Sequence, residues 1–147
     1  MDRDADLTIA GLSIWVEGPQ TYGNGHVDRQ WLELRAVAEA PGARIEIAGP
    51  FLRRMDFRSF CRELAAVHKC LLGTAQLCSP EPDMNLRVKG DGMGHIEITL
   101  DLMSRDGDQT HRIIWTVDQT YLPTSLSQLR ALLITATLAA RRARRPT

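Results

Sequence analysis

The sequence has no excess of charge of either sign and no long hydrophobic run. Lysine and arginine number 18, aspartate and glutamate also number 18, and the formal net charge is zero. This balance argues against a protein whose main task is to wrap nucleic acid or to lie on an anionic membrane. The longest uncharged apolar stretch, residues 131–140, has about half of the roughly 20 residues that a membrane-spanning helix needs. We therefore expect neither a membrane span nor a nucleic-acid partner.

Cysteine is also scarce, and its spacing fits neither a redox motif nor a zinc site. Cys61, Cys70 and Cys78 are odd in number and form no CxxC pair, so we expect free thiols. The first six residues lack the basic start and the apolar run of a secretory signal. Together these absences predict a cytoplasmic protein.

Chain length and residue content are those of one globular domain. The chain has 147 residues, 44% of them hydrophobic and 24% charged, as in ordinary folded domains. We expect a single domain over residues 1–147, with an ordered core over residues 7–140 and a basic C-terminal tail over residues 141–147. No internal repeat or linker divides the sequence.

Apolar residues near the N-terminus alternate with polar ones at a period of two, which is typical of strands. The alternation covers residues 7–9 and 12–16 and slips at Ala10-Gly11. Two short strands joined by a turn, or one bent strand, fit this pattern equally. The segment from Gly18 to Asp28 is rich in glycine and has no period, so we expect the longest loop there.

Strand periods dominate the rest of the chain as well. Residues 32–47 alternate on both sides of Pro41-Gly42, which predicts a β-hairpin. Alternation returns over residues 84–88, 96–102 and 111–117, and the connections between these segments are short and rich in glycine and aspartate. Such connections favour antiparallel pairing of neighbours in a meander.

Two segments carry the helical period instead. Residues 57–72 have an apolar stripe, with Asp56 as the expected N-cap and Gly73 as the expected end of the helix. Ser125 and Gln128 have the spacing of a capping box just before a second apolar stripe. We expect a second helix there.

The order of these elements predicts an α+β fold. An antiparallel β-sheet of about six to eight strands, connected as a meander, would be packed on one face by two helices in a two-layer sandwich. The other face of the sheet, which carries the polar residues of each strand, would remain in contact with solvent.

No set of residues predicts catalysis, a metal or a cofactor. The glycines of residues 90–94 join two alternating segments, which favours a hairpin turn over a phosphate-binding loop. His95 and Glu97 share one face of a strand, but no third metal ligand stands at a diagnostic spacing. His68 lies in the apolar arc of the first helix, which predicts a buried structural histidine with no nucleophile to activate. We therefore expect a protein that is not an enzyme.

The solvent face of the predicted sheet holds the candidates for partner binding. Trp31 is a candidate anchor, because its neighbours Leu32 and Leu34 belong to the opposite face. The candidate partner-binding residues are Trp31, Glu33, Arg35, His95 and Glu97. The loop from Gly18 to Asp28 is a further candidate surface.

The C-terminal tail carries a cluster of arginines, namely Arg141, Arg142, Arg144 and Arg145. Cations at the C-terminus of a helix stabilise it through the helix dipole, and this interpretation is favoured. Contact with RNA or with an acidic partner is the alternative.

Two runs of residues resemble those of a known family. Gly90 to Ile98 reads Gly-Asp-Gly-Met-Gly-His-Ile-Glu-Ile, and Asp118 to Pro123 reads Asp-Gln-Thr-Tyr-Leu-Pro. Both runs are similar to motifs of the WapI-type immunity proteins, in which the first opens a strand and the second ends the last strand before the final helix. The likeness extends over roughly residues 7–138.

The resemblance implies a small cytoplasmic protein of bacterial polymorphic-toxin systems that binds and neutralises a cognate toxin domain. We expect the two motifs to be structural and not part of the surface that contacts the toxin. Two alternatives come from other classes: a homo-oligomeric structural module that pairs through an exposed strand edge or helix face, and an RNA-contacting accessory protein that uses the arginine tail.

Overall fold

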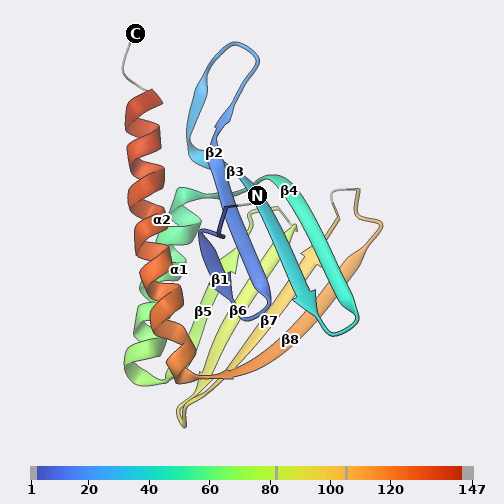
Figure 1. Cartoon of the computed structure of the whole chain (residues 1–147), viewed down its shortest axis with the longest axis vertical. Helices are drawn as coiled ribbons and strands as arrows, with labels where there is room; N and C mark the ends of the chain where they lie inside the picture. Colours follow the sequence, from blue (N-terminus) through green and yellow to red (C-terminus); the bar gives the residue numbers. More distant parts are fainter. Residues whose placement is uncertain (1–2, 82, 105, 144–147) are drawn as a thin grey trace.

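The protein has eight strands, two α-helices and one short 3-10 helix (Figure 1). The structure is a computed structural model that describes residues 3–81, 83–104 and 106–143, with side chains up to residue 135. In chain order the elements are β1 (Leu7–Ile9), β2 (Leu12–Thr21), β3 (Val27–Ala40), β4 (Ala43–Arg53), α1 (Arg54–Cys70), β5 (Leu72–Cys78), β6 (Met84–Asp91), β7 (His95–Met103), β8 (Thr110–Asp118), η1 (Gln119–Tyr121) and α2 (Leu122–Ala143).

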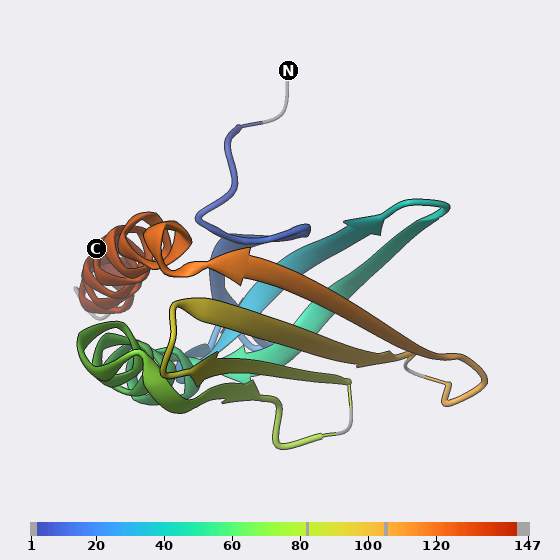
Figure 2. The same cartoon turned by 90° about the horizontal axis from the view of Figure 1, so that it is seen from below.

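The strands form two antiparallel sheets of four, ordered β1-β2-β3-β4 and β5-β6-β7-β8. The predicted α+β class, the antiparallel meander, the strand number and the two helices are confirmed. The division into two sheets was not predicted, and it arises where α1 separates β4 from β5. In Figure 1 the strands of the two sheets run in crossing directions, and Figure 2 shows both helices side by side at one side of the molecule. Four strands followed by a helix therefore occur twice along the chain.

A single hydrophobic cluster joins the two sheets and both helices. Its fully buried members come from β1 to β7, from α1 and from α2. The largest aromatic members are Phe51, Phe57 and Phe60, which are at most 1% exposed. Strand β8 differs, because its core-facing side chains Ile113, Trp115 and Val117 pack against the cluster but are only half-buried.

The predicted loop from Gly18 to Asp28 is mostly strand. Strand β2 continues to Thr21 and β3 begins at Val27, so the connection is only residues 22–26. Shifts in the β2–β3 register lie between Val16 and Gly18 and between Pro19 and Thr21. Bulges of this kind let a strand hold glycine and proline without losing its partner, which is why the composition of this segment was misleading.

The ends of α1 also differ from expectation. Asp56 is not the N-cap but lies inside the first turn, where its carboxylate accepts a hydrogen bond of 2.8 Å from the backbone N–H of the N-cap, Arg53. The helix ends at Leu71, which has a left-handed φ of 58°, and not at Gly73, which lies in β5.

The predicted capping box of α2 has another role. Ser125 Oγ donates to the backbone oxygen of Thr8 at 2.8 Å, and the backbone N–H of Thr8 donates to Gln128 Oε1 at 2.8 Å. Thr8 lies in β1, the outermost strand of its sheet, so α2 covers an edge that would otherwise be open. Helix α1 does the same for β5, because Glu63 Oε1 accepts from the backbone N–H of Gln76 at 2.9 Å.

The two sequence motifs meet in space. Gly94 accepts a hydrogen bond of 2.9 Å from the backbone N–H of Gln119, and His95 is the register partner of Asp118. The turn between β6 and β7 also contacts α1, because the N–H of Gly92 donates to the backbone oxygen of Leu71 at 2.6 Å. The motifs therefore build the corner where α1 ends and α2 begins, which agrees with the structural role that we expected for them.

Asp118 predicts a dependence of stability on pH. The hydroxyl and the backbone N–H of Thr120 both donate to its carboxylate and hold the pKa of Asp118 below its usual value. A carboxyl group with a lowered pKa in the folded state stabilises the fold above its usual pKa, and this stabilisation is lost as the pH falls through the lowered value. Urea unfolding should therefore show Asp118→Asn to be less stable than wild type near pH 6, with the difference shrinking towards about pH 3. A difference independent of pH would contradict this account.

Candidate functional site

Two adjoining hollows lie beside the connection between β5 and β6, and both are lined by Glu81. The larger has a volume of about 700 Å³ and also borders the ends of β6, β7 and β8. The smaller, of about 400 Å³, also borders Trp31 and Pro50 of the first sheet. The connection is held in place by Ser79, whose buried hydroxyl donates to the backbone oxygen of Phe51 in β4 at 2.5 Å. This hydrogen bond connects the loop between β5 and β6, in the second sheet, to β4 of the first sheet.

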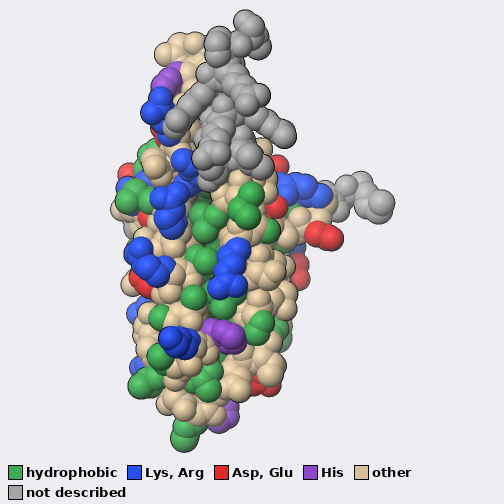
Figure 3. Space-filling model, turned by 90° about the vertical axis from the view of Figure 1, so that its left-hand side faces the viewer, with side chains coloured by type: hydrophobic (Ala, Val, Ile, Leu, Met, Phe, Trp, Pro, Cys, Tyr) green, Lys and Arg blue, Asp and Glu red, His purple; other side chains and the backbone are tan. Residues whose placement is uncertain are grey.

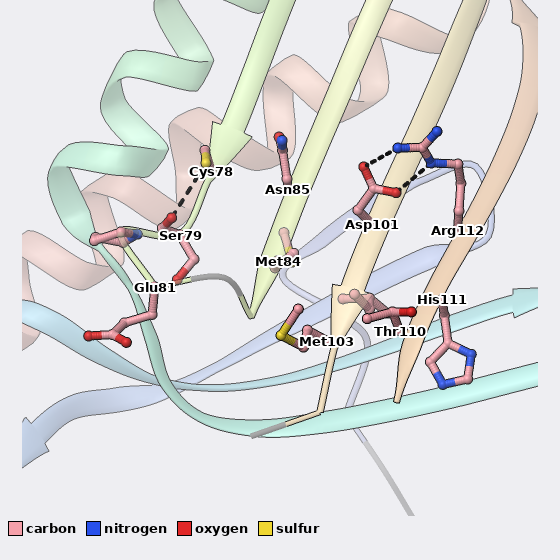
Figure 4. A pocket seen from close by; sticks show the side chains of 12 residues that line it. Cys78, Ser79, Glu81, Met84, Asn85, Asp101, Met103, Thr110, His111 and Arg112 are labelled. Atoms are coloured by element: carbon pink, nitrogen blue, oxygen red, sulfur yellow. Dashed lines mark hydrogen bonds and ion pairs between the residues drawn. The ribbon is translucent and has the colours of Figure 1, made fainter. Parts of the chain in front are cut away.

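The larger hollow combines an apolar part with a fixed ion pair (Figure 4). Met84 and Met103 line its middle, and Asp101 and Arg112 lie on the adjacent strands β7 and β8. Arg112 Nε is 2.7 Å from Asp101 Oδ1, and this contact raises the pKa of Arg112. Arg87 is 3.6 Å from the same carboxylate. The charges on this wall are therefore already paired.

The smaller hollow places an indole ring beside carboxylates. Trp31 is half-buried, its backbone N–H donates to Asp28 Oδ1 at 2.9 Å, and the guanidinium of Arg53 lies 5.7 Å from its ring centre. Glu81 and Asp83 line the same hollow, and neither has an ion-pair partner within the described part of the chain. An aromatic face next to unpaired carboxylates fits a cationic side chain. We call this set, with Gln20 and Pro50, the Trp31 hollow.

None of the other candidate residues lines the Trp31 hollow, and they do not share one face of a single sheet. Glu33 and Arg35 follow Trp31 on β3, where the guanidinium of Arg35 lies 4.0 Å from the ring centre of Trp15. His95 and Glu97 lie on β7, in the second sheet. The expectation of one continuous solvent face was wrong, because the strands divide into two sheets.

His95 and Glu97 border a shallow hollow of about 290 Å³ together with Lys89, Asp91 and Thr116. His95 Nδ1 lies 2.9 Å from Asp91 Oδ2, and the hydrogen bonds that Asp91 accepts from the backbone of Met93 and from His95 lower its pKa. The arrangement fixes the turn that starts β7. Among the described residues, no group of histidine, cysteine, aspartate or glutamate could hold a metal ion.

Sequence reasoning missed Glu81, Asp83 and Arg112. The run Pro80-Glu81-Pro82-Asp83 was the available signal, because two prolines and two acids between strands indicate a stiff acidic connection. Its position beside Trp31 depends on how the sheets pack, which the local pattern does not contain.

His68 does not lie where the sequence predicted, whereas the three cysteines are free as expected. His68 was predicted to be buried but is exposed, because the buried stripe of α1 consists of Phe57, Phe60, Leu64 and Val67. The cysteines are free: Cys61 is half-buried, and Cys70 and Cys78 are exposed. No helix among the described residues is long and apolar enough to cross a membrane.

The exposed face of the two helices is basic (Figure 3). Arg58, Arg62, Lys69 and Arg130 are exposed there, and none has a carboxylate partner within the residues that the structure describes. Arg141 and Arg142 lie outside the described side chains, and Arg144 and Arg145 lie outside the described residues. The interpretation of the tail arginines therefore remains a prediction.

The chain was compared with known proteins. The sequence profile of the Immunity protein WapI-like family matches residues 6–135. No curated protein matches the sequence.

Solved structures match this chain at low identity and with TM-scores below 0.5. WHY3 from Arabidopsis thaliana has 12% identity and a TM-score of 0.47, over 89% of this chain and 84% of that one. The CdiA-CT/CdiI toxin and immunity complex from Enterobacter cloacae has 10% identity and a TM-score of 0.47, over 82% of this chain and 99% of that one. The plant transcriptional regulator PBF-2 has 13% identity and a TM-score of 0.47, over 90% of this chain and 79% of that one.

Proposed function

Because the chain belongs to the immunity protein WapI-like family, we propose that it protects its cell by binding a toxin domain directly, without catalysing a reaction. The observation that carries this proposal is the family match, which extends over residues 6–135. Binding would take place in the cytoplasm, where a toxin domain that enters or is made in the cell would act.

The Trp31 hollow is the surface that we propose for contact with the toxin. Interface energy concentrates in a few aromatic or arginine anchors that sit in preformed hollows. The Arg53 guanidinium lies 5.7 Å from the ring centre of Trp31, and Glu81 and Asp83 line the same hollow and supply negative charge. A lysine or arginine of the toxin domain could stack on the indole and pair with a carboxylate as water is excluded.

The remaining candidate residues extend this proposal. Glu33 and Arg35 continue along β3 from Trp31 and would lie at the rim of the same interface. His95 and Glu97 belong to the other sheet and would contact the toxin only if it reaches around the molecule.

Growth of cells that express the toxin domain from the neighbouring gene tests the proposed function. Co-expression of this chain should restore growth, and the two proteins should purify together as a stable complex. Failure of both would leave the family membership without a neutralising partner and would overturn direct binding to that toxin.

Replacing Trp31 by alanine should weaken toxin binding at least about 30-fold, or about 2 kcal/mol, because it removes the proposed anchor. Trp31→Phe should keep most of the affinity, since a ring remains. Titration calorimetry with the purified toxin domain measures the loss.

Met93→Ala is the matched control, because Met93 is 79% exposed at the turn between β6 and β7. It should leave toxin affinity unchanged. Glu81→Lys combined with Asp83→Lys should weaken binding by a similar factor to Trp31→Ala if the toxin presents a cation. Unchanged affinity in both the Trp31→Ala and the charge-reversed variants would place the interface elsewhere.

A further inference from the structure

In each sheet a helix covers one outer strand, and no strand or helix among the described residues pairs with the other. Helix α2 covers β1 through Ser125 and Gln128, and α1 covers β5 through Glu63. The opposite outer strands are β4 and β8. An open edge presents unpaired N–H and C=O groups that can pair with another chain.

Strand β4 carries features that discourage such pairing. Its exposed side chains Arg44 and Glu46 are charged and lie 3.4 Å apart as an ion pair. Pro50 removes a backbone donor, and the register with β3 shifts beside it. Charge, proline and bulges are the usual means by which proteins protect an edge.

Strand β8 has neither a proline nor a bulge, and its one interior charge, Arg112, is paired with Asp101 of its own sheet at 2.7 Å. It spans Thr110–Asp118 with the sequence Thr-His-Arg-Ile-Ile-Trp-Thr-Val-Asp, which lacks glycine, proline and lysine. Its register with β7 runs without a shift from His95 to Met103. A regular strand rich in β-branched residues is well suited to accept another strand.

The hydrogen bonds at the two ends of β8 determine which of its backbone groups are free. The N–H of Ser104 donates to Gln109 and the N–H of Gln119 donates to Gly94, both at 2.9 Å. Hydrogen-bonded and non-hydrogen-bonded residue pairs alternate along an antiparallel ladder. The backbone N–H and C=O groups of the odd-numbered residues of β8 therefore bind β7, and those of the even-numbered residues point away from it. The outward groups belong to Thr110, Arg112, Ile114, Thr116 and Asp118.

The side chains of β8 are also incompletely covered. Core-facing apolar side chains of β5 to β7 are at most 3% exposed, whereas Ile113, Trp115 and Val117 are only half-buried. On the outer face Ile114 is 57% exposed. One more strand beside β8 would cover both sets.

We infer that two copies of this chain pair through β8, antiparallel and centred on Ile114. This register joins even-numbered residues to even-numbered ones, as the free backbone groups require. Ile114 then faces itself, Ile113 faces Trp115, and Thr110 faces Asp118. Arg112 faces Thr116 and lies diagonal to Asp118, within reach of a long side chain. No like charges face each other, so the strand is complementary to a second copy of itself.

Pairing at β8 would join the two second sheets into one continuous sheet of both copies. Thr110, His111 and Arg112 also line the larger hollow. The end of β8 from the second copy would therefore lie along the rim of that hollow. Self-pairing does not depend on toxin binding, since Trp31 lies on the first sheet.

Cysteine cross-linking tests the register. The background is Cys70→Ser with Cys78→Ser, which removes the two exposed thiols. Ile114→Cys would place two cysteines opposite each other with Cα atoms about 5.5 Å apart, which suits a disulfide. Thr116→Cys is the matched control, because its two copies would lie four residues out of register, about 13 Å apart. Mild oxidation should cross-link the first variant and not the second.

The mass in solution tests the pairing itself. Light scattering should give a dimer for the wild type at about 100 μM, where mass action favours association. Ile114→Lys should give a monomer with unchanged circular dichroism, since two ammonium groups would then face each other.

A monomeric wild type together with no cross-link in the Ile114→Cys variant would overturn the inference, as would equal cross-linking of both cysteine variants. Slow hydrogen exchange of the Arg112, Ile114 and Thr116 amides that appears only after toxin is added would also overturn it. That result would assign the β8 edge to the toxin.

Discussion

Replacing Gly11 by alanine should lower the free energy of unfolding by about 3 kcal/mol. A Cβ atom at this position would lie 2.0 Å from the backbone oxygen of Glu39 and 2.9 Å from Cζ2 of Trp115. Glu39 cannot move away freely, because its N–H donates to the Gly11 oxygen at 2.9 Å. The added methyl group must therefore separate the β1–β2 turn from the end of β3.

Urea unfolding measures this loss, and Gly23→Ala is its matched control. Gly23 lies in the short connection between β2 and β3, and a Cβ there would have no atom within 4 Å. The control should change stability by less than about 0.5 kcal/mol. Equal effects of the two substitutions would show that the close approach at Gly11 is absent in solution.

The double variant Ser125→Ala and Gln128→Ala should cost about 3 kcal/mol and should promote aggregation. Each lost hydrogen bond leaves a backbone group of Thr8 without its partner. The free energy of unfolding falls by about 1–3 kcal/mol for each such group that water cannot reach. The same change uncovers the edge of β1 for pairing with other chains.

Thermal unfolding and size-exclusion chromatography measure both effects. Ser127→Ala is the control, because Ser127 is exposed on the same helix. It should behave as wild type. A double variant that unfolds and elutes as wild type does would show that α2 does not protect β1.

Local patterns predicted the strands because each strand turns one face to the shared core. The alternation in β6 and β7, for example, matches buried Leu86 and Val88 and buried Ile98 and Leu100. The division into two sheets could not be predicted in the same way. It depends on β5 pairing with β6 and not with β4, and that choice is set by how α1 packs.

The candidate site shows the same limit. Trp31 was a candidate anchor because Leu32 and Leu34 belong to the opposite face; these two leucines are buried and Trp31 is half-buried, and its contact with a partner stays a prediction. Its neighbour Glu81 comes from a loop 50 residues later, which only tertiary packing brings near. Ser125 and Gln128 have the spacing of a capping box, but the backbone of Thr8 binds both side chains instead.

The cover over β1 has a consequence for how the chain is made. Glu63 and Gln76 are separated by 13 residues, whereas Thr8 and Gln128 are separated by 120. A ribosome that adds about 5–20 residues per second needs roughly 6 to 24 seconds to reach Gln128 after Thr8. The first sheet must therefore emerge with its β1 edge bare, while the edge of β5 meets its cover at once. The nascent chain is most exposed to misassociation during that interval, and slower translation lengthens it.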